Sequence, residues 1–301
     1  MTPPGTVCNV DRCVPTPRTT AARPDVLRRE KYGTRLTLDT AMPESVWVHT
    51  DLAGKVAIIT GGAGGIGAVF GRALAEQGAS VVLADLDHER AAKVADSIAA
   101  DGGAAIGVGL DVTNPDSTKA VVADTTERWG GLDILINSAA LMAEIPFGPL
   151  DTFPLDWWER VIAVNLTGPL LCTQAATPAM AARGGGRIVN MVSAGAFQPA
   201  GVYGVSKYAL VGLTMNLAAQ LGAKGITVNA IAPGLVADEA GMRALPDGPI
   251  RESIKAPIPL KTHVEGPPED LVGTLLLLVS AAGGWITGQT ISVDGGWIMR
   301  F

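Results

Sequence analysis

The chain has 301 residues, of which 48% are hydrophobic and 17% are charged, and its formal net charge is −6. The apolar content excludes disorder of the whole chain, because disordered sequences are rich in charge and poor in apolar residues. The acidic balance disfavours a nucleic-acid partner, since such proteins usually carry a basic face. Three cysteines, Cys8, Cys13 and Cys172, cannot build a disulfide framework and favour a reducing, cytoplasmic setting.

Residues 1–51 differ from the remainder of the sequence. They hold 6 of the 20 prolines and show no clear apolar period. We therefore expect a disordered or loosely attached N-terminal extension, followed by one folded domain at residues 52–301. The N-terminus lacks the apolar core of a secretory signal. Residues 271–293 carry no charge, but a glycine pair and a polar run interrupt them, which predicts a buried helix, a turn and a strand rather than a membrane helix.

From Leu52 onward, short apolar runs alternate with segments of helical periodicity. The predicted strands are residues 55–60, 80–84, 105–110, 132–136, 187–192, 226–231 and 290–293. The predicted helices are a segment from Ile66 to a stop at Gly78, then residues 88–100, 115–129, 156–180, 203–221 and 268–280. Such alternation predicts a parallel sheet with helices on both faces, joined by right-handed crossovers. The predicted fold class is α/β, a doubly wound, Rossmann-type parallel sheet in a single domain.

A glycine-rich segment, Thr60-Gly-Gly-Ala-Gly-Gly-Ile-Gly67, joins the first predicted strand to the first helix. Glycines let the backbone turn tightly and approach a ligand closely. The helix N-terminus then offers free N–H groups and a positive dipole to a pyrophosphate. A glycine cluster alone is a weak signal, because any tight turn can use glycine. The strand before it and the helix after it favour a dinucleotide-binding turn.

Asp85 ends the second predicted strand, about 20 residues further on, where a carboxylate can bind the ribose hydroxyls of a dinucleotide. The alternative is a solvated loop residue. A carboxylate there would repel the 2′-phosphate of NADP, and neither Arg nor Lys occurs within the glycine turn to attract one. The sequence therefore predicts NAD as the cofactor.

The spacing Thr-Gly-x3-Gly-Ile-Gly resembles that of the short-chain dehydrogenase/reductase family, in its compact single-domain branch. The resemblance covers about residues 52–297. Asp111-Val-Thr113 matches the family's adenine-contact motif, and Pro233-Gly234 matches its turn after the sixth strand. The sequence departs from the family at Asn137-Ser-Ala-Ala140, where Asn-Asn-Ala-Gly is usual, and at Asp238, where a Thr or Ser often grips the carboxamide.

This resemblance implies which residues would surround the dinucleotide. They are Gly61, Gly65, Ile66, Gly67, Asp85, Asp111, Val112, Asn137, Ala139, Tyr203, Lys207, Pro233, Gly234 and Val236.

Four residues would form the family's Ser-Tyr-Lys-Asn active site, namely Ser193, Tyr203, Lys207 and Asn165. Tyr203 and Lys207 are four residues apart at the start of a predicted helix, so they project from one face. Each residue also has an ordinary interpretation: an amphipathic helix pair, a turn or cap serine, and a capping asparagine. Their occurrence together, in this order and downstream of the glycine turn, favours the catalytic interpretation.

The expected chemistry is hydride transfer at an alcohol carbon, which needs a base for the hydroxyl proton. Free tyrosine has a pKa of about 10, too high for a base near neutral pH. A Lys207 ammonium about 4 Å from the Tyr203 oxygen would contribute about 4 kcal/mol toward lowering that pKa. The resemblance implies that Ser193 holds the substrate oxygen and that Asn165 holds a water linked to Lys207.

Loops after the strands are expected to form the substrate site, because ligands of open parallel sheets lie beyond the carboxyl ends of the strands. Glu144 and Arg243 are among the few charges there, which suggests an uncharged, mainly apolar ketone or secondary alcohol, unless the apolar side chains only pack the loops together. Residues 237–268 could form a lid. The apolar residues are Leu141, Met142, Phe147, Phe197, Val202, Leu235, Met242 and Leu245.

The sequence thus predicts a cytoplasmic, NAD-dependent short-chain alcohol dehydrogenase or ketone reductase, working in the oxidative direction on a small molecule. Alternatives are a 3-oxoacyl-thioester reductase that uses NADPH, and a dinucleotide-binding protein without catalysis. The scattered histidines, His49, His88 and His263, lack metal-ligand spacing, so no metal is expected. No nucleic acid or membrane partner is expected. The resemblance implies a homo-oligomer, usually a tetramer, with apolar residues 285–301 compatible with a subunit contact.

Overall fold

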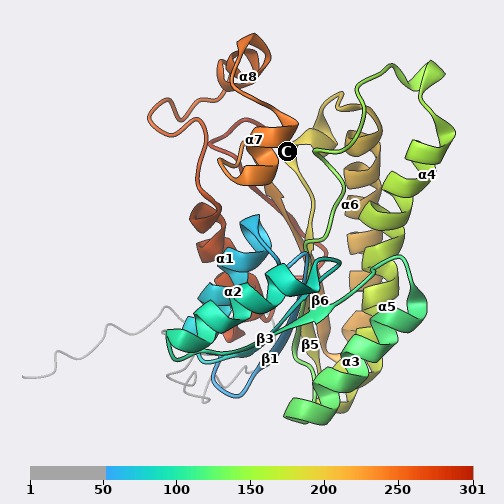
Figure 1. The fold of residues 1–301 in the computed structure, drawn as a ribbon, viewed down its shortest axis with the longest axis vertical. Coiled ribbons are helices and arrows are strands. Elements are labelled where there is room, and N and C mark those ends of the chain that lie inside the picture. Colours follow the sequence, from blue (N-terminus) through green and yellow to red (C-terminus); the bar gives the residue numbers. More distant parts are fainter. Residues whose placement is uncertain (1–51, 301) are drawn as a thin grey trace, which may run out of the picture. The chain divides into compact units, whose positions relative to one another are not determined.

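Among the described residues, seven parallel strands form one sheet in the order β3-β2-β1-β4-β5-β6-β7. Figure 1 shows this sheet between helices. The computed structural model describes residues 52–300, so the predicted loosely attached extension lies outside the described residues. The strands are β1 (Val56–Thr60), β2 (Ser80–Asp85), β3 (Ala104–Gly109), β4 (Ile134–Asn137), β5 (Gly186–Met191), β6 (Ile226–Pro233) and β7 (Thr290–Val293). The predicted α/β, doubly wound, Rossmann-type domain is confirmed.

The strand order reverses between β1 and β4. The chain runs from β1 outward through β2 to β3 and then returns, placing β4 on the other side of β1. Thr60 at the end of β1 is in register with Ala84 of β2 and with Asn137 of β4. In open parallel sheets a ligand crevice forms at such a reversal, outside the carboxyl ends of the strands.

Helices cover both faces of the sheet (Figure 1). Alternate strand residues point to opposite faces: Ala57 and Ile59 pack on one side, Val56 and Ile58 on the other. The first side is covered by α1 (Gly65–Glu76), α2 (His88–Ala100) and α9 (Val272–Val279), the second by α3 (Pro115–Trp129), α5 (Gly168–Ala182) and α6 (Gly201–Leu221). Both faces of a parallel sheet are thus buried, which explains its nearly continuous apolar strands.

The long helix predicted at residues 156–180 is interrupted. It consists of α4 (Leu155–Ile162), a π-helical turn, η3 (Ala163–Thr167), and α5. Pro169 lies in the first turn of α5 and lacks the N–H needed for an i→i−4 bond. The helical prediction is right in type, but the helix is widened locally around Asn165. Such π-helical turns are frequently found at functional sites.

Two short helices stand beyond the carboxyl ends of the strands, α7 (Glu239–Ala244) and α8 (Pro249–Lys255) (Figure 1). An isolated β-bridge between Val236 and Gly266 joins the two ends of the segment that carries α7 and α8. Inside it, the buried Arg251 guanidinium donates from Nε to Glu265 Oε2 at 3.0 Å and also binds the Leu245 carbonyl oxygen. The stretch expected as a lid is therefore internally braced, while its motion stays a prediction.

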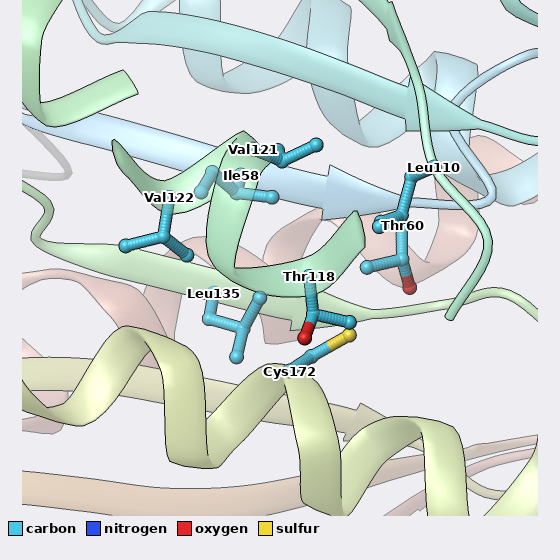
Figure 2. Close-up of a pocket in the computed structure, with 8 residues that line it drawn as sticks. All are labelled: Ile58, Thr60, Leu110, Thr118, Val121, Val122, Leu135 and Cys172. Carbon is cyan, nitrogen blue, oxygen red and sulfur yellow. The ribbon is translucent and has the colours of Figure 1, made fainter. Parts of the chain in front are cut away.

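A small apolar cavity lies between α3, α5 and the sheet (Figure 2). Its volume of about 10 Å³ is near the lower limit for one water molecule. Burial raises the pKa of the Cys172 thiol on its wall to about 12, so this cysteine is an inert core residue. The cavity is a packing gap rather than a ligand site. Its lining residues are Ile58, Thr60, Leu110, Thr118, Val121, Val122, Leu135 and Cys172.

None of the helices in residues 52–300 is both long enough and apolar enough to cross a bilayer. The uncharged residues 271–293 contain α9 and β7, as the sequence predicts.

Candidate active site

The glycine turn between β1 and α1 requires glycine at two positions. One has a backbone conformation that favours glycine, and both leave no room for a side chain. Gly61 has φ +71°, in the left-handed region that favours glycine. A methyl group on Gly61 would lie 2.8 Å from the Ala139 nitrogen, and one on Gly67 would collide with the Gly61 carbonyl oxygen. The turn is therefore packed backbone against backbone below the N-terminus of α1. This cradle fits a pyrophosphate, which needs close approach to free N–H groups.

Asp85 is held at the end of β2 beside that turn. Its Oδ2 accepts a hydrogen bond from the Ala63 nitrogen and its Oδ1 one from the Asp87 nitrogen, both at 3.0 Å. The half-buried carboxylate is thus fixed in place, with acceptor capacity left for ribose hydroxyls. This geometry fits the predicted ribose contact.

Arg90 is a charged residue at this site that sequence reasoning missed. A methyl group on Gly64 would lie 2.7 Å from Arg90 Nη2, so the guanidinium lies directly against the glycine turn. The same Nη2 donates to Glu239 Oε2 of α7 at 2.8 Å. The available signal was its place in the first turn of α2, a helix N-capped by Asp87 two residues after Asp85.

The residues predicted to contact the adenine follow β3. Asp111 Oδ1 accepts hydrogen bonds from the nitrogen and hydroxyl of Thr113, at 2.9 and 2.6 Å. Val112 is buried and packs against Gly168 at the start of α5. The Asp-Val-Thr segment is therefore a fixed turn at the carboxyl edge of the sheet.

The altered Asn-Ser-Ala-Ala segment keeps its backbone contacts. The nitrogens of Ser138 and Ala139 both donate to Thr60 Oγ1 at 3.1 Å. Asn137 Nδ2 donates to Asn190 Oδ1 on the neighbouring strand at 2.8 Å, while Asn137 Oδ1 is buried without a partner. The departures from the family motif at Ser138 and Ala140 therefore leave the hydrogen bonds from this segment to β1 and β5 in place.

The turn after β6 places an acidic side chain over the glycine turn. Gly234 donates its N–H to the Val293 carbonyl oxygen at 2.9 Å, and Val236 forms the bridge described above. Asp238 then N-caps α7 by accepting from the Gly241 nitrogen at 2.7 Å. A methyl group on Gly65 would lie 2.5 Å from Asp238 Oδ2. Pro233, the last residue of β6, is buried at the base of this turn.

Tyr203, Lys207 and Ser193 meet where β5 and α6 approach each other. Lys207 Nζ lies 5.7 Å from the centroid of the Tyr203 ring and donates to the Met191 carbonyl oxygen at 2.8 Å. Ser193 follows β5, and its hydroxyl accepts a hydrogen bond from the Gly195 nitrogen at 3.1 Å. The structure brings these three predicted residues together.

The ionisation of this group differs from the expected one. Burial raises the pKa of Tyr203 to about 12, although a hydrogen bond with Ser193 lowers it, and the nearby Asp238 carboxylate adds to the rise. Burial also lowers the pKa of Lys207 to about 8. Since removal from water disfavours both charged forms, desolvation outweighs the expected effect of the ammonium on the phenol. The half-buried Tyr203 phenol therefore favours its protonated form near neutral pH.

Asn165 lies in the π-helical turn and is fully buried. Its Oδ1 accepts from the Leu141 nitrogen at 2.8 Å, and its Nδ2 donates to the Leu141 carbonyl oxygen at 3.0 Å and to Ser206 Oγ at 3.1 Å. Both N–H donors of the amide are thus engaged. The side chain holds the loop after β4 against α6, and the water linked to Lys207 stays a prediction.

The predicted substrate-side residues have mixed surroundings. Val202 is buried, whereas Phe147 is 90% exposed. Phe197 packs edge-on against Tyr208, with ring centroids 6.2 Å apart. An ion pair of 2.8 Å joins Arg243 of α7 to Glu144 in the loop after β4. The remaining residues are half-buried or exposed: Leu141, Met142, Leu235, Met242 and Leu245.

Within residues 52–300, no group of three or more His, Cys, Asp or Glu side chains is arranged to hold a metal ion.

The site can now be compared with known proteins. A family model described as enoyl-(acyl carrier protein) reductase matches residues 61–298, which include the glycine turn and all four predicted catalytic residues. The chain belongs to the short-chain dehydrogenase/reductase family. The predicted family resemblance is therefore confirmed, and the protein is an oxidoreductase of this type.

Similar proteins include one uncharacterised oxidoreductase and two that are named for different substrates. An uncharacterised oxidoreductase of Mycobacterium tuberculosis is 46% identical over 246 residues, covering 82% of this chain and 98% of the relative. The sorbitol dehydrogenase of Cereibacter sphaeroides is 39% identical, covering 81% and 98%. A solved structure from Beutenbergia cavernae, described as a putative NAD(P)-dependent gluconate 5-dehydrogenase with bound NADP, is 33% identical, with a TM-score of 0.76 and coverage of 82% and 98%.

Proposed function

We propose that this protein transfers a hydride between NAD and a mainly apolar secondary alcohol or ketone, with Tyr203 as the acid or base. The observation that carries the proposal is the position of Asp238: its carboxylate lies over Gly65 and also acts on the Tyr203 phenol. The glycine turn and Tyr203 are therefore close enough for one carboxylate to act on both.

When bound, the oxidised nicotinamide supplies the hydride acceptor. Tyr203 takes the hydroxyl proton of an alcohol, or gives its own proton to a carbonyl oxygen in the reverse direction. Ser193 holds the substrate oxygen by a hydrogen bond. Lys207 carries a positive charge beside the phenol below about pH 8, which favours the phenolate during alcohol oxidation. The protonated Tyr203 of the ligand-free protein is already suited to carbonyl reduction.

NAD is the proposed cofactor because Asp85 occupies the ribose position. A fixed carboxylate repels a 2′-phosphate and accepts hydrogen bonds from ribose hydroxyls. Steady-state turnover with NAD⁺ and NADP⁺, on a panel of secondary alcohols that includes polyols, tests cofactor and substrate together. We expect turnover with NAD⁺. A clear preference for NADP⁺ would overturn the cofactor assignment, and binding without turnover across the panel would favour a silent dinucleotide-binding protein.

A 3-oxoacyl-thioester reductase that uses NADPH is the second candidate. Arg90 favours it, because its guanidinium lies against the glycine turn, near where the 2′-phosphate of NADPH would lie, although Glu239 pairs with this guanidinium. A 3-oxoacyl-[acyl-carrier-protein] reductase of Synechocystis is also 36% identical to this chain over 255 residues. Oxidation of NADPH by a 3-oxoacyl thioester, at a rate above that of any simple ketone, would select this candidate.

We further propose a cytoplasmic homo-oligomer, as a tetramer. Trp285 is 98% exposed in this single chain, and Met299 is exposed on the same C-terminal segment. Exposed large apolar side chains of this kind are often covered in an assembly. Light scattering should give about four times the chain mass, and a monomer would contradict the assembly. Cell fractionation tests the location.

A further inference from the structure

The dipeptide Ala63–Gly64 is flanked by two charges of opposite sign. The Asp85 carboxylate accepts a hydrogen bond from the Ala63 nitrogen, and the Arg90 guanidinium lies against Gly64. Asp85 stands where ribose hydroxyls are read in the proposed function. Arg90 is therefore beside the position at which a dinucleotide either carries a 2′-phosphate or does not.

Arg90 is occupied by a second acid. Its Nη2 donates to Glu239 Oε2 at 2.8 Å, across a gap of 149 residues in sequence. Arg90 and Arg243 together lower the pKa of Glu239, so this carboxylate is ionised near neutral pH. The pair joins α2, which follows the ribose-binding strand, to α7, which covers the substrate side.

We infer that Glu239 is a specificity-determining residue for the cofactor, because it holds and neutralises the only arginine that lies against the glycine turn among residues 52–300. With Glu239 in place, a 2′-phosphate meets the Asp85 carboxylate without a free cation to offset it. Without Glu239, Arg90 becomes a free planar donor next to that phosphate, and arginine binds phosphates through strong charge-assisted hydrogen bonds. The inference rests on the proposed dinucleotide site but not on the identity of the substrate.

The helix that carries Glu239 takes part in a second ion pair. Glu239 lies on the short helix that also carries Arg243, which pairs with Glu144 in the loop after β4. A shift of α7 therefore changes the state of Arg90 as well as the wall of the substrate site.

The test compares dissociation constants of NADH and NADPH, measured by fluorescence on the full chain, for wild type and Glu239→Gln. We expect Glu239→Gln to shift the ratio toward NADPH about tenfold, a change of about 1.4 kcal/mol. The ratio is the relevant quantity, because a general loss of dinucleotide affinity cancels in it. Turnover is not needed for this readout.

Two further variants make the result specific. Asp101→Asn is the matched control, since it removes one surface carboxylate that pairs with Arg72 at the far end of α2; its ratio should equal that of wild type. The double variant Arg90→Gln/Glu239→Gln should lose the shift. A Glu239→Gln ratio equal to wild type, or a shift that persists without Arg90, would overturn the inference.

Failure of the proposed function gives a different result. A wild-type chain that binds neither dinucleotide would overturn the proposed function and this inference with it. A wild-type chain that prefers NADPH would overturn only the NAD assignment, because the inference concerns the change caused by Glu239→Gln.

Discussion

The Lys207 ammonium donates a 2.8 Å hydrogen bond to the Met191 carbonyl oxygen, the last residue of β5. Lys207 is 3% exposed, so this contact fixes a buried cation between the sheet and α6. Ser193 follows Met191 by two residues, and Tyr203 lies one helical turn before Lys207. One hydrogen bond therefore positions the strand end and the helix that together carry the proposed proton-transfer group.

Replacement of the phenol should separate chemistry from binding. Tyr203→Phe keeps the ring but removes the proton-transfer group, so we expect kcat to fall by ~10²–10⁴-fold while NADH affinity changes little. Lys207→Met should reduce both kcat and NADH affinity, because it also removes the hydrogen bond to the Met191 carbonyl oxygen. Steady-state kinetics and NADH fluorescence measure the two effects. Tyr208→Phe, on the exposed side of α6, is the matched control and should behave as wild type.

The ligand-free phenol should stay protonated well into the alkaline range. Because burial raises the pKa of Tyr203 to about 12, its phenolate absorbance should be absent from the wild-type minus Tyr203→Phe difference spectrum up to about pH 10. The folded pKa is above that of free tyrosine, so the related stabilisation is complete below about pH 10. It is lost as the pH rises through 12. A difference titration with a midpoint near pH 7 would contradict this.

The sheet and most helices could be predicted because buried parallel strands are short apolar runs, and the helices between them show regular periodicity. The cluster of Tyr203, Lys207 and Ser193 was also within reach, because strand ends of a parallel sheet meet at one edge. These features depend on local patterns and on a connection rule that holds for nearly all such sheets.

Other features depend on contacts between distant segments. The π-helical turn around Asn165 requires the Leu141 backbone as a partner, and the Arg90–Glu239 pair requires α7 to pack near α2. The high pKa of Tyr203 arises from burial, which the spacing between Tyr203 and Lys207 does not report. The periodicity of the sequence gives no information on contacts between distant segments or on the burial of a single side chain.

Loss of the Asn165 amide should lower the thermal stability of the protein. Asn165→Ala would leave both the N–H and the carbonyl of Leu141 without their partner. An unsatisfied group costs up to about 1–3 kcal/mol when fully buried, and the Leu141 groups are part-buried; each 1 kcal/mol lowers the Tm of a domain of this size by ~2–4 °C. Thermal unfolding checks this. Asn216→Ala, which removes one exposed bond within α6, should change the Tm by less than a third as much.

Alanine at two glycines should affect different properties, NADH affinity at Gly67 and stability at Gly212. Gly67→Ala would drive a methyl group into the Gly61 carbonyl oxygen, so the phosphate-binding turn must open and NADH affinity should fall at least tenfold. Gly212 lies on the exposed side of α6, where a methyl group would meet no atom within 4 Å. Gly212→Ala should therefore stabilise the helix by roughly 0.5–1 kcal/mol without changing NADH affinity. Equal NADH affinity in the two variants would show that the glycine turn does not contact the dinucleotide, because only Gly67→Ala alters its backbone.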